Sequence, residues 1–515
     1  MLNNSVAYFA RTRPAKTACV DLQTGERLSF ADLDQRAARM AAALQHVSGK
    51  AELAGERIAV LARNSSALIC LHLACRRVRA IFVPLNFRLS AVELAVLARQ
   101  ADPFLILVHP DFDALAADLH AGSPTSRIMS FGADGEFMRI TASVTHAPPV
   151  RPPASDTIVT LLYTSGTSGR PKGVMVTEAN AHATARNYAL SVGLDASSVF
   201  LCDMPLFHVV GLFTIVGSVL EAGGTLLIAS QFEPRATQSW IAEKKLQVSH
   251  YFCVPQMAQM LRQLPDFDPA FFRRLRALQT GGAPHPAAPV LAWVRERVRC
   301  VDGFGMTEAG TVLGMPPDDL ALLRRKAGSV GVPAANITVR VVDKSGRDVG
   351  AGEVGELWLR GPSVTPGYWR DETATRAAFH DGWLRTGDAA TQDGEGFFAL
   401  VDRWKDMFIS GGENVYPAEV EAALGEMPGV LEVAVIGVAD QKWGEVGSAY
   451  LVLSPRAQFA PDAVLAHCRR RLAGYKVPKE FHVVDALPRT ASGKVRKDLL
   501  RGSELTQSMG KAAAS

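Results

Sequence analysis

Short apolar runs alternate with helix-like segments along the first 230 residues of this chain of 515 residues. The apolar run at residues 57–61 is followed by a helical pattern at 66–77, and the helical pattern at 91–100 is followed by an apolar run at 104–108. Strands that alternate with helices in this way form parallel sheets covered by helices. We therefore predict an α/β fold for this part of the chain.

The character of the sequence changes twice further on. From residue 337 onward β-type alternation dominates, at residues 338–342 and 356–360, and after Asp402 the chain has the features of a compact α+β unit. In that last part helices are predicted at 415–424 and 462–472, and strands at 433–438 and 449–453. We predict a large N-terminal domain, residues 1–401, with two α/β sheet subdomains and a β-rich subdomain, and a small mobile α+β C-terminal domain, residues 402–515.

Two local features add detail to the N-terminal part of the chain. Ser29 and Asp32 form a predicted capping box for a helix that runs toward Leu44. A proline-rich stretch at residues 147–153 precedes the apolar run at 158–162, and it is either a linker between subdomains or an ordinary loop.

The composition excludes several classes of protein. With 48% hydrophobic and 21% charged residues the chain is typical of a globular enzyme. The net charge of +4, from 55 basic and 51 acidic residues, gives no strong field for nucleic acid. The basic run at 469–471 is expected to be a solvated helix face, and a site for a polyanionic ligand such as a nucleotide tail is the alternative.

Seven cysteines are scattered along the chain without a C-x-x-C pair, which is typical of buried thiols in a reducing compartment. No window approaches the ~20 apolar residues that span a bilayer, and the N-terminus lacks the pattern of a signal peptide. We expect a cytoplasmic protein without a transmembrane segment, for which a peripheral membrane contact and a homodimer both remain open.

The stretch at residues 163–173, Tyr-Thr-Ser-Gly-Thr-Ser-Gly-Arg-Pro-Lys-Gly, is suited to holding phosphate. Its three glycines let backbone N–H groups turn toward an anion, while its five hydroxyl groups and Lys172 add donors and charge. It is not a Walker loop, because Pro171 and Gly173 stand where that motif needs glycine and Ser or Thr. An ordinary surface turn is the alternative. The predicted phosphate contacts are Thr164, Ser165, Gly166, Thr167, Ser168, Gly169 and Lys172.

Further motifs follow in a fixed order. They are Phe-His at 207–208, Gly-Phe-Gly-Met-Thr-Glu at 303–308, Arg-Thr-Gly-Asp at 385–388, Arg-Trp-Lys-Asp at 403–406, Ser-Gly-Gly-Glu-Asn at 410–414 and Pro-Arg-Thr-Ala-Ser-Gly-Lys at 488–494. Together with the stretch at 163–173 they resemble the adenylate-forming superfamily of acyl- and aryl-CoA ligases, peptide-synthetase adenylation domains and firefly-type luciferases. The resemblance implies that a carboxylic acid is activated with ATP and Mg²⁺ to an acyl-adenylate and then passed to a thiol such as that of CoA.

The resemblance also implies roles for individual residues of the ATP site. Glu308 would be the ligand of Mg²⁺ and Thr307 would contact phosphate oxygens, while Lys494 would stabilise the charge that develops in adenylation. Phe304, between Gly303 and Gly305, stands where many members carry the tyrosine that stacks on adenine. The remaining assignments are Asp388 for the ribose hydroxyls, Arg403 for ribose or phosphate, and His208 for a gate between the two half-reactions.

The second half-reaction implies a rotation of the C-terminal domain about a hinge, and Asp402 occupies the hinge position. Gly411, Gly412 and Glu413 would line the path of the pantetheine arm, since glycines permit close backbone approach. Trp443, Tyr475 and Lys476 are candidates for binding the adenine and phosphates of CoA, although core packing is an alternative for Trp443.

Segments that line the acyl pocket in relatives are apolar here, namely Val209, Gly211, Phe213, Tyr251, Gly281, Gly282 and Met306. Without an obvious charge in these segments a dicarboxylic acid is disfavoured, because its second carboxylate would be buried unpaired. The glycines at 281, 282, 303 and 305 are expected to leave room for a ring or an alkyl chain.

We predict an AMP-forming acid–CoA ligase for a fatty or aryl acid, including acids of the benzoate and hydroxycinnamate types. The acid and CoA are the expected small-molecule partners. Members that activate amino acids typically carry aspartate, which pairs with the substrate ammonium, at the position that His208 occupies here, so an amino-acid substrate is disfavoured. Alternatives are an enzyme that loads the phosphopantetheine of a carrier protein, a luciferase-like oxygenase, and an inactive nucleotide-binding regulator.

Overall fold

The structure is a computed structural model that describes residues 2–144, 153–165, 171–282, 287–403, 406–410, 413–455, 457, 459–472, 474–489 and 495–502. The chain divides into two compact units, Met1–Val339 with Leu359–Leu384, and Arg340–Trp358 with Arg385–Ser515. The boundary predicted at Asp402 concerns a hinge motion and stays a prediction. Most of the proline-rich stretch at 147–153 lies outside the described residues.

The first unit contains a six-stranded sheet whose spatial order is β6-β5-β3-β4-β7-β8. The strands are β3 (Arg57–Leu61), β4 (Ile81–Pro84), β5 (Leu105–Val108), β6 (Arg127–Ser130), β7 (Ile158–Ser165) and β8 (Pro171–Thr177). Only the β7–β8 pair is antiparallel. Strands β4 and β5 are buried throughout, as expected for parallel strands covered on both faces. The strand predicted at 57–61 is confirmed.

A nine-stranded sheet forms the rest of this unit, in the order β15-β14-β13-β12-β11-β9-β10-β1-β2. The strands are β1 (Thr17–Asp21), β2 (Arg27–Ser29), β9 (Val199–Cys202), β10 (Thr225–Ile228), β11 (His250–Cys253), β12 (Ala277–Gly281), β13 (Cys300–Met306), β14 (Gly310–Gly314) and β15 (Val332–Pro333). Strands β1, β10, β9, β11, β12 and β13 run parallel, so the segments that follow their carboxyl ends meet at one edge.

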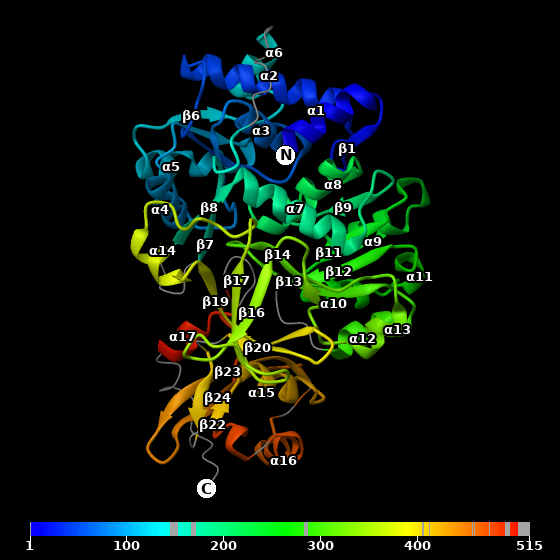
Figure 1. Ribbon diagram of the computed structural model, residues 1–515, viewed down its shortest axis with the longest axis vertical. Helices are drawn as coiled ribbons and strands as arrows, with labels where there is room; N and C mark the ends of the chain where they lie inside the picture. Colours follow the sequence, from blue (N-terminus) through cyan, green and yellow to red (C-terminus); the bar gives the residue numbers. More distant parts are fainter. Residues whose placement is uncertain are drawn as a thin grey trace. The chain divides into compact units, whose positions relative to one another are not determined.

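Helices cover both sheets (Figure 1). They are α1 (Leu2–Thr12), α2 (Phe30–Ser48), α3 (Ser66–Arg77), α4 (Ala91–Ala101), η1 (Pro110–Leu115), α5 (Ala116–Gly122), α6 (Glu136–Ser143), α7 (Glu178–Val192), η2 (Val210–Gly217), α8 (Ser218–Ala222), α9 (Pro234–Ala242), η3 (Lys244–Leu246), α10 (Pro255–Arg262), α11 (Pro269–Phe272), α12 (Ala287–Arg295), α13 (Leu320–Arg325) and α14 (Glu372–Ala378). The predicted helix at 66–77 and the capping box of Ser29 with Asp32 are confirmed. None of the helices within the described ranges is long and apolar enough to cross a membrane.

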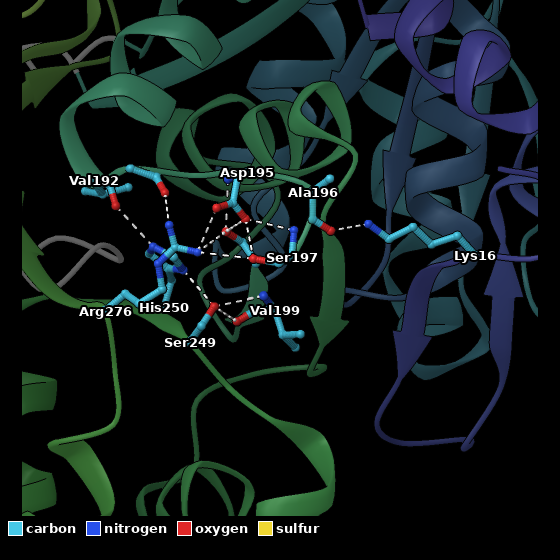
Figure 2. A network of polar contacts seen from close by, with 11 residues as sticks. Lys16, Val192, Asp195, Ala196, Ser197, Val199, Ser249, His250 and Arg276 are labelled. Carbon is cyan, nitrogen blue, oxygen red and sulfur yellow. Dashed lines mark hydrogen bonds and ion pairs between the residues drawn. The ribbon is translucent and has the colours of Figure 1, made fainter. Parts of the chain in front are cut away.

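A polar network fixes the amino-terminal ends of β9 and β11 (Figure 2). The carboxylate of Asp195 accepts a hydrogen bond from the Ser197 hydroxyl at 2.6 Å and pairs with Arg276 at 3.1 Å. These contacts, with that of Ser197 the largest, lower the pKa of Asp195 to about 2. Burial lowers the pKa of His250 to about 4, so its ring is neutral near pH 7. The network lies at the edge of the sheet opposite the carboxyl ends of these strands and stabilises the scaffold.

The second unit includes parts of a sheet whose order is β16-β17-β19-β18, with β20 paired to β19. Its strands are β16 (Thr338–Val342), β17 (Gly355–Arg360), β18 (Phe379–His380), β19 (Trp383–Gln392) and β20 (Phe398–Arg403). The predicted β-type segments at 338–342 and 356–360 are confirmed. The boundary between the two compact units passes through β16, β17 and β19.

The C-terminal part has a sheet in the order β22-β21-β24-β23, with β25 paired to β24. Its elements are β21 (Phe408–Ser410), β22 (Glu413–Val415), α15 (Pro417–Gly425), β23 (Val430–Asp440), β24 (Gly444–Leu453), α16 (Pro461–Arg471), η4 (Gly474–Lys476), β25 (Glu480–Val483) and α17 (Lys497–Gly502). The helix predicted from residue 415 begins instead at Pro417, because Val415 ends a strand and proline is favoured in the first turn of a helix. All seven cysteines are buried and free of disulfide bonds, as expected.

Candidate active site

The stretch predicted to bind phosphate begins in β7 and ends in β8, and these two strands pair with each other. Strand β7 continues to Ser165, and Thr164 and Ser165 pair with Lys172 and Pro171 of β8. Strand β7 therefore continues beyond the apolar run at 158–162, because antiparallel pairing with β8 extends it to Ser165. Gly166, Thr167, Ser168 and Gly169 lie outside the described residues, and their contacts with phosphate stay predictions.

A second hairpin, formed by β13 and β14, carries Thr307 and Glu308 in its turn. Both residues are half-buried, as is Phe304 near the end of β13. The turn continues into Gly310, which has φ +61°, and a Cβ atom there would overlap the side chain of Thr184 on α7. Glycine is therefore required at this position, both for the backbone conformation and for the close approach to α7.

Residues 363–369 connect the two hairpins. The Thr365 amide donates to the carbonyl of Glu308 at 2.7 Å, and the Thr365 hydroxyl donates to the carbonyl of Met175 on β8 at 2.6 Å. The Tyr368 hydroxyl donates to Glu308 Oε1 at 2.9 Å, and the Lys172 ammonium lies 4.9 Å from the centre of the Tyr368 ring. Burial raises the pKa of the Tyr368 phenol far above its usual range, so this group stays a donor.

Sequence reasoning missed Tyr368 and Thr365. Neither residue is charged, and the hydrogen bond from Tyr368 to Glu308 joins residues 60 positions apart. The nearest signal in the sequence is the run Gly367-Tyr368-Trp369, where Gly367 has φ +142°. The glycine is a turn signal, and nothing in the local sequence connects the tyrosine with Glu308.

A cavity of about 10 Å³, the size of one water molecule, joins the polar turn to apolar side chains. Thr307 and Glu308 line it together with Val209 and Phe213. Phe213 belongs to η2, a π-helix, which is a form of helix often found at functional sites. The structure thus brings two predicted acyl-pocket residues next to the predicted metal and phosphate ligands.

His208 is half-buried directly before this π-helix. Its ring packs edge-on against Phe207, with 4.5 Å between the ring centres. The backbone amide of His208 donates to the carbonyl of Pro205 at 3.1 Å, so the segment turns sharply after β9. This position is compatible with the gate predicted for His208, and that role stays a prediction.

The expectation that the glycines leave room for substrate is wrong at three positions. A Cβ on Gly281 would lie 2.9 Å from the carbonyl oxygen of Gly303, and one on Gly303 would lie 2.6 Å from Gln279 Nε2. A Cβ on Gly305 would overlap the carbonyl of Gly310. These glycines allow strands to pack closely, so they create no space. Only Gly282 has an open Cβ position, and its φ of +80° still favours glycine.

Two buried carboxyl groups near the carboxyl ends of the strands also escaped sequence reasoning. Asp203 follows β9 and accepts hydrogen bonds at Oδ2 from the hydroxyls of Tyr251 and Thr237, both at 2.9 Å. Asp302 precedes Gly303 on β13. Burial raises the pKa of each carboxyl to about 7. The Tyr251 side chain, predicted to line the acyl pocket, is fully buried and engaged with Asp203.

In the second unit Asp388 is buried and its backbone pairs with that of Arg403 across β19 and β20. The preceding Gly387 has φ +70°, and the Asp388 amide donates to the Thr386 hydroxyl at 3.0 Å. Glu356 lies beneath this turn and was not predicted. The pairing brings together two residues assigned to the ribose, although the Arg403 side chain lies outside the described atoms.

Two of the predicted CoA-binding residues, Glu413 and Trp443, lie at one end of the C-terminal sheet. Ser410 pairs with Glu413 on one side and with Gly444, the residue that follows Trp443, on the other. Trp443 is 38% exposed, which excludes core packing, and the Lys442 ammonium lies 5.1 Å from its ring centre. Gly411 and Gly412 lie outside the described residues.

Tyr475 and Lys476 form part of η4, which packs beside β22 and β24. The Lys476 ammonium donates to both carboxylate oxygens of Glu419, at 2.7 and 2.8 Å. A phosphate would therefore have to compete with Glu419 for Lys476. Lys494 lies outside the described residues, and its catalytic role stays a prediction.

Comparison with known proteins agrees with this arrangement. The sequence matches the AMP-binding enzyme family over residues 6–369 and the AMP-binding enzyme C-terminal domain over residues 419–494. The chain belongs to this family of adenylate-forming enzymes, which confirms the resemblance found in its motifs.

The similar proteins cover nearly the whole chain. A feruloyl-CoA synthase of Amycolatopsis is 39% identical over 96% of both chains, and a long-chain-fatty-acid–CoA ligase of Mycobacterium tuberculosis is 34% identical over 96% of both chains. The o-succinylbenzoate CoA synthetase of Bacillus subtilis, solved with ATP and magnesium ion, superposes with a TM-score of 0.86 at 29% identity, covering 96% of this chain and 99% of that one. The protein is therefore an enzyme of the acyl- and aryl-CoA ligase family.

Proposed function

We propose that this enzyme is an ATP- and Mg²⁺-dependent ligase that joins an apolar carboxylic acid to CoA through an acyl-adenylate. The observation that carries the proposal is the small cavity that Thr307 and Glu308 line together with Val209 and Phe213. A phosphoanhydride end and an apolar acid end must meet where the carboxylate is activated, and this juxtaposition provides both.

The residues of the turn suit Mg²⁺. Magnesium is held by oxygen ligands and commonly uses one or two carboxylates together with substrate phosphates and water. Glu308 is half-buried, has one carboxylate oxygen oriented by Tyr368, and lines the same cavity as Thr307. When bound, the ion would neutralise negative charge on the phosphates. Glu308 would hold it, and Thr307 would donate to a phosphate oxygen.

The reaction then needs two displacements. In the first, a carboxylate oxygen of the acid attacks the α-phosphorus of ATP and pyrophosphate leaves; we assign stabilisation of this charge to Lys494 and Lys172. In the second, the CoA thiolate attacks the acyl carbon and AMP leaves. Asp388 and Arg403 are assigned to the ribose, and Asp402 is the proposed hinge that exchanges the two steps.

We propose aryl acids of the hydroxycinnamate type as the first substrate class to test, with fatty acids as the second. The feruloyl-CoA synthase is more similar to this chain than the long-chain-fatty-acid–CoA ligase is, at 39% against 34% identity over the same coverage. Both relatives are named for CoA products, so loading of a carrier protein is not favoured. Seven free cysteines suit the reducing cytoplasm, which we propose as the location.

The test is a panel of hydroxycinnamates, benzoates and fatty acids of increasing chain length, incubated with ATP and Mg²⁺ with and without CoA. Mass spectrometry would follow AMP, acyl-AMP and the thioester. We expect a CoA thioester from one class of acid and none from the Glu308→Gln variant. Acyl-AMP that accumulates and is consumed by a phosphopantetheinylated carrier protein, but not by CoA, would contradict the proposal.

A further inference from the structure

We propose that Tyr368 is a positioning residue of the adenylation site, which orients the metal ligand Glu308 and at the same time supports Lys172 of the phosphate-binding hairpin. This inference rests on the proposed function, because it takes Glu308 as the ligand of Mg²⁺. Tyr368 is the described residue whose side chain contacts both of these groups.

The backbone around Tyr368 is held against the phosphate-binding hairpin. The Trp369 amide donates to the carbonyl of Gly173 at 2.7 Å, and the Met175 amide donates to the carbonyl of Gly367 at 3.1 Å. Tyr368 itself forms a bridge with Val174 of β8. The ring of Tyr368 therefore starts from a fixed point on the strand that carries Lys172.

The hydroxyl of Tyr368 reaches from that strand to the second hairpin, where it donates to Glu308 Oε1 at 2.9 Å. The same segment holds the main chain of Glu308, since the Thr365 amide donates to its carbonyl at 2.7 Å. With its backbone and one carboxylate oxygen both restrained, Glu308 loses rotational freedom before any metal arrives. A hydrogen bond to a ligating carboxylate fixes its orientation and tunes its affinity for the metal.

The face of the same ring receives the ammonium of Lys172, 4.9 Å from the ring centre. This is within the range in which a cation is attracted to an aromatic face. The side chain of Tyr368 thus contacts both Lys172, the proposed phosphate-binding cation, and Glu308, the proposed metal ligand. The two functions are chemically separable, because the first needs only the ring and the second needs only the hydroxyl.

Tyr368→Phe separates them, since it removes the hydroxyl and keeps the ring. We expect the Mg²⁺ concentration needed for half-maximal acyl-AMP formation to rise about tenfold, and the rate to recover at high Mg²⁺. Mn²⁺ binding gives a readout that is independent of turnover. It is measured from the loss of the free Mn²⁺ EPR signal, in the presence of an ATP analogue with a methylene group between the α- and β-phosphorus atoms. The affinity of the Tyr368→Phe variant for Mn²⁺ should fall by a similar factor.

Tyr368→Leu removes both contacts and should in addition raise the KM for ATP above that of the phenylalanine variant. Tyr188→Phe, which removes the hydroxyl of a buried tyrosine on α7, is the matched control and should change neither quantity. Melting temperatures of all variants would report loss of fold.

Unchanged binding of Mn²⁺ by a folded Tyr368→Phe variant would overturn the proposal for the hydroxyl. Equal KM values for ATP in the phenylalanine and leucine variants would overturn it for the ring. If the wild-type enzyme activated none of the acids, the proposed function would fail, whereas the Mn²⁺ measurement would still decide whether Tyr368 orients Glu308.

Discussion

Glu356 and Arg385 form an ion pair beneath the turn that leads to Asp388. The buried Glu356 carboxylate accepts hydrogen bonds from the guanidinium of Arg385 at 3.2 and 3.3 Å, and from the amide of Gly387 at 3.3 Å. It also accepts from the Trp358 indole at 2.9 Å. A single acidic side chain therefore fixes the backbone just before the residue assigned to the ribose.

Glu356→Gln should weaken ATP binding indirectly, through the turn that precedes Asp388. The amide keeps the size of the side chain but loses the charge that pairs with Arg385, and a hydrogen bond to a charged group is worth ~1.5–3 kcal/mol. We expect a KM for ATP raised several-fold and a lower melting temperature, measured by initial rates and thermal unfolding. Glu353→Gln, in the exposed turn at Gly350, is the control and should leave the KM unchanged.

Lys494→Ala tests the predicted catalytic lysine. Loss of its charge should slow acyl-AMP formation by about two orders of magnitude or more, since removal of one group that stabilises developing charge has effects of this size. Thioester formation from supplied acyl-AMP and CoA should be comparatively intact. An equal loss in both half-reactions would contradict the assignment of Lys494 to adenylation alone.

Asp402→Pro tests the predicted hinge. Proline fixes φ, so the variant should keep adenylation and lose most of its thioester formation. Proline at this position can also remove a hydrogen bond of the sheet, because Asp402 lies inside β20 and pairs with Ala389. Retained adenylation by the variant therefore serves as the control for intact folding. Thioester formation at the normal rate would show that the hinge lies elsewhere.

Trp443→Ala should raise the KM for CoA and leave acyl-AMP formation unchanged, because Trp443 is exposed at the end of the sheet where the predicted CoA segments meet. Loss of a stacking aromatic costs ~1–3 kcal/mol per base, or roughly 5- to 150-fold in affinity. Steady-state kinetics with varied CoA would measure the effect. Leu431→Ala serves as the control, because Leu431 is also apolar and exposed but lies on β23.

Asp203→Asn should change the pH dependence of stability. Burial raises the pKa of the folded-state carboxyl from 3.8 to about 7, so between these values the unfolded chain releases a proton that the folded chain keeps. This group therefore makes the folded state less stable as pH rises from about 4 to 7, by at most ~4 kcal/mol, and adds no further change above pH 7.

The asparagine side chain does not titrate, so the stability of the variant lacks this dependence on pH. The melting temperature of the variant relative to that of the wild type should therefore increase from about pH 4 to pH 7 and then level off. Thermal unfolding between pH 4.5 and 8.5 would measure it. Asp318→Asn, at an exposed position, is the comparison and should show no such trend. A difference between Asp203→Asn and wild type that stays constant with pH would show that Asp203 is ionised in the folded enzyme.

Local patterns in the sequence predicted much of the fold. The strand at 57–61, the helix at 66–77 and the capping box at Ser29 depend on residues close in the chain, and the structure confirms them. The motif order also identified the family. It singled out Thr307, Glu308 and Asp388 as well, and their roles stay predictions.

The tertiary structure alone decided what surrounds those residues. The contacts of Tyr368 with Glu308 and of Glu356 with Arg385 join positions 60 and 29 residues apart. Glu356 and Arg385 meet because β17 and β19 are neighbouring strands, whereas Tyr368 meets Glu308 because residues 363–369 pack against both hairpins. Tertiary packing also reversed the expectation for Gly281, Gly303 and Gly305, whose missing side chains admit neighbouring backbone or side-chain atoms and leave no space for a ligand. Periodicity records the neighbours of a residue along the chain, whereas packing across a sheet depends on the path of the whole chain.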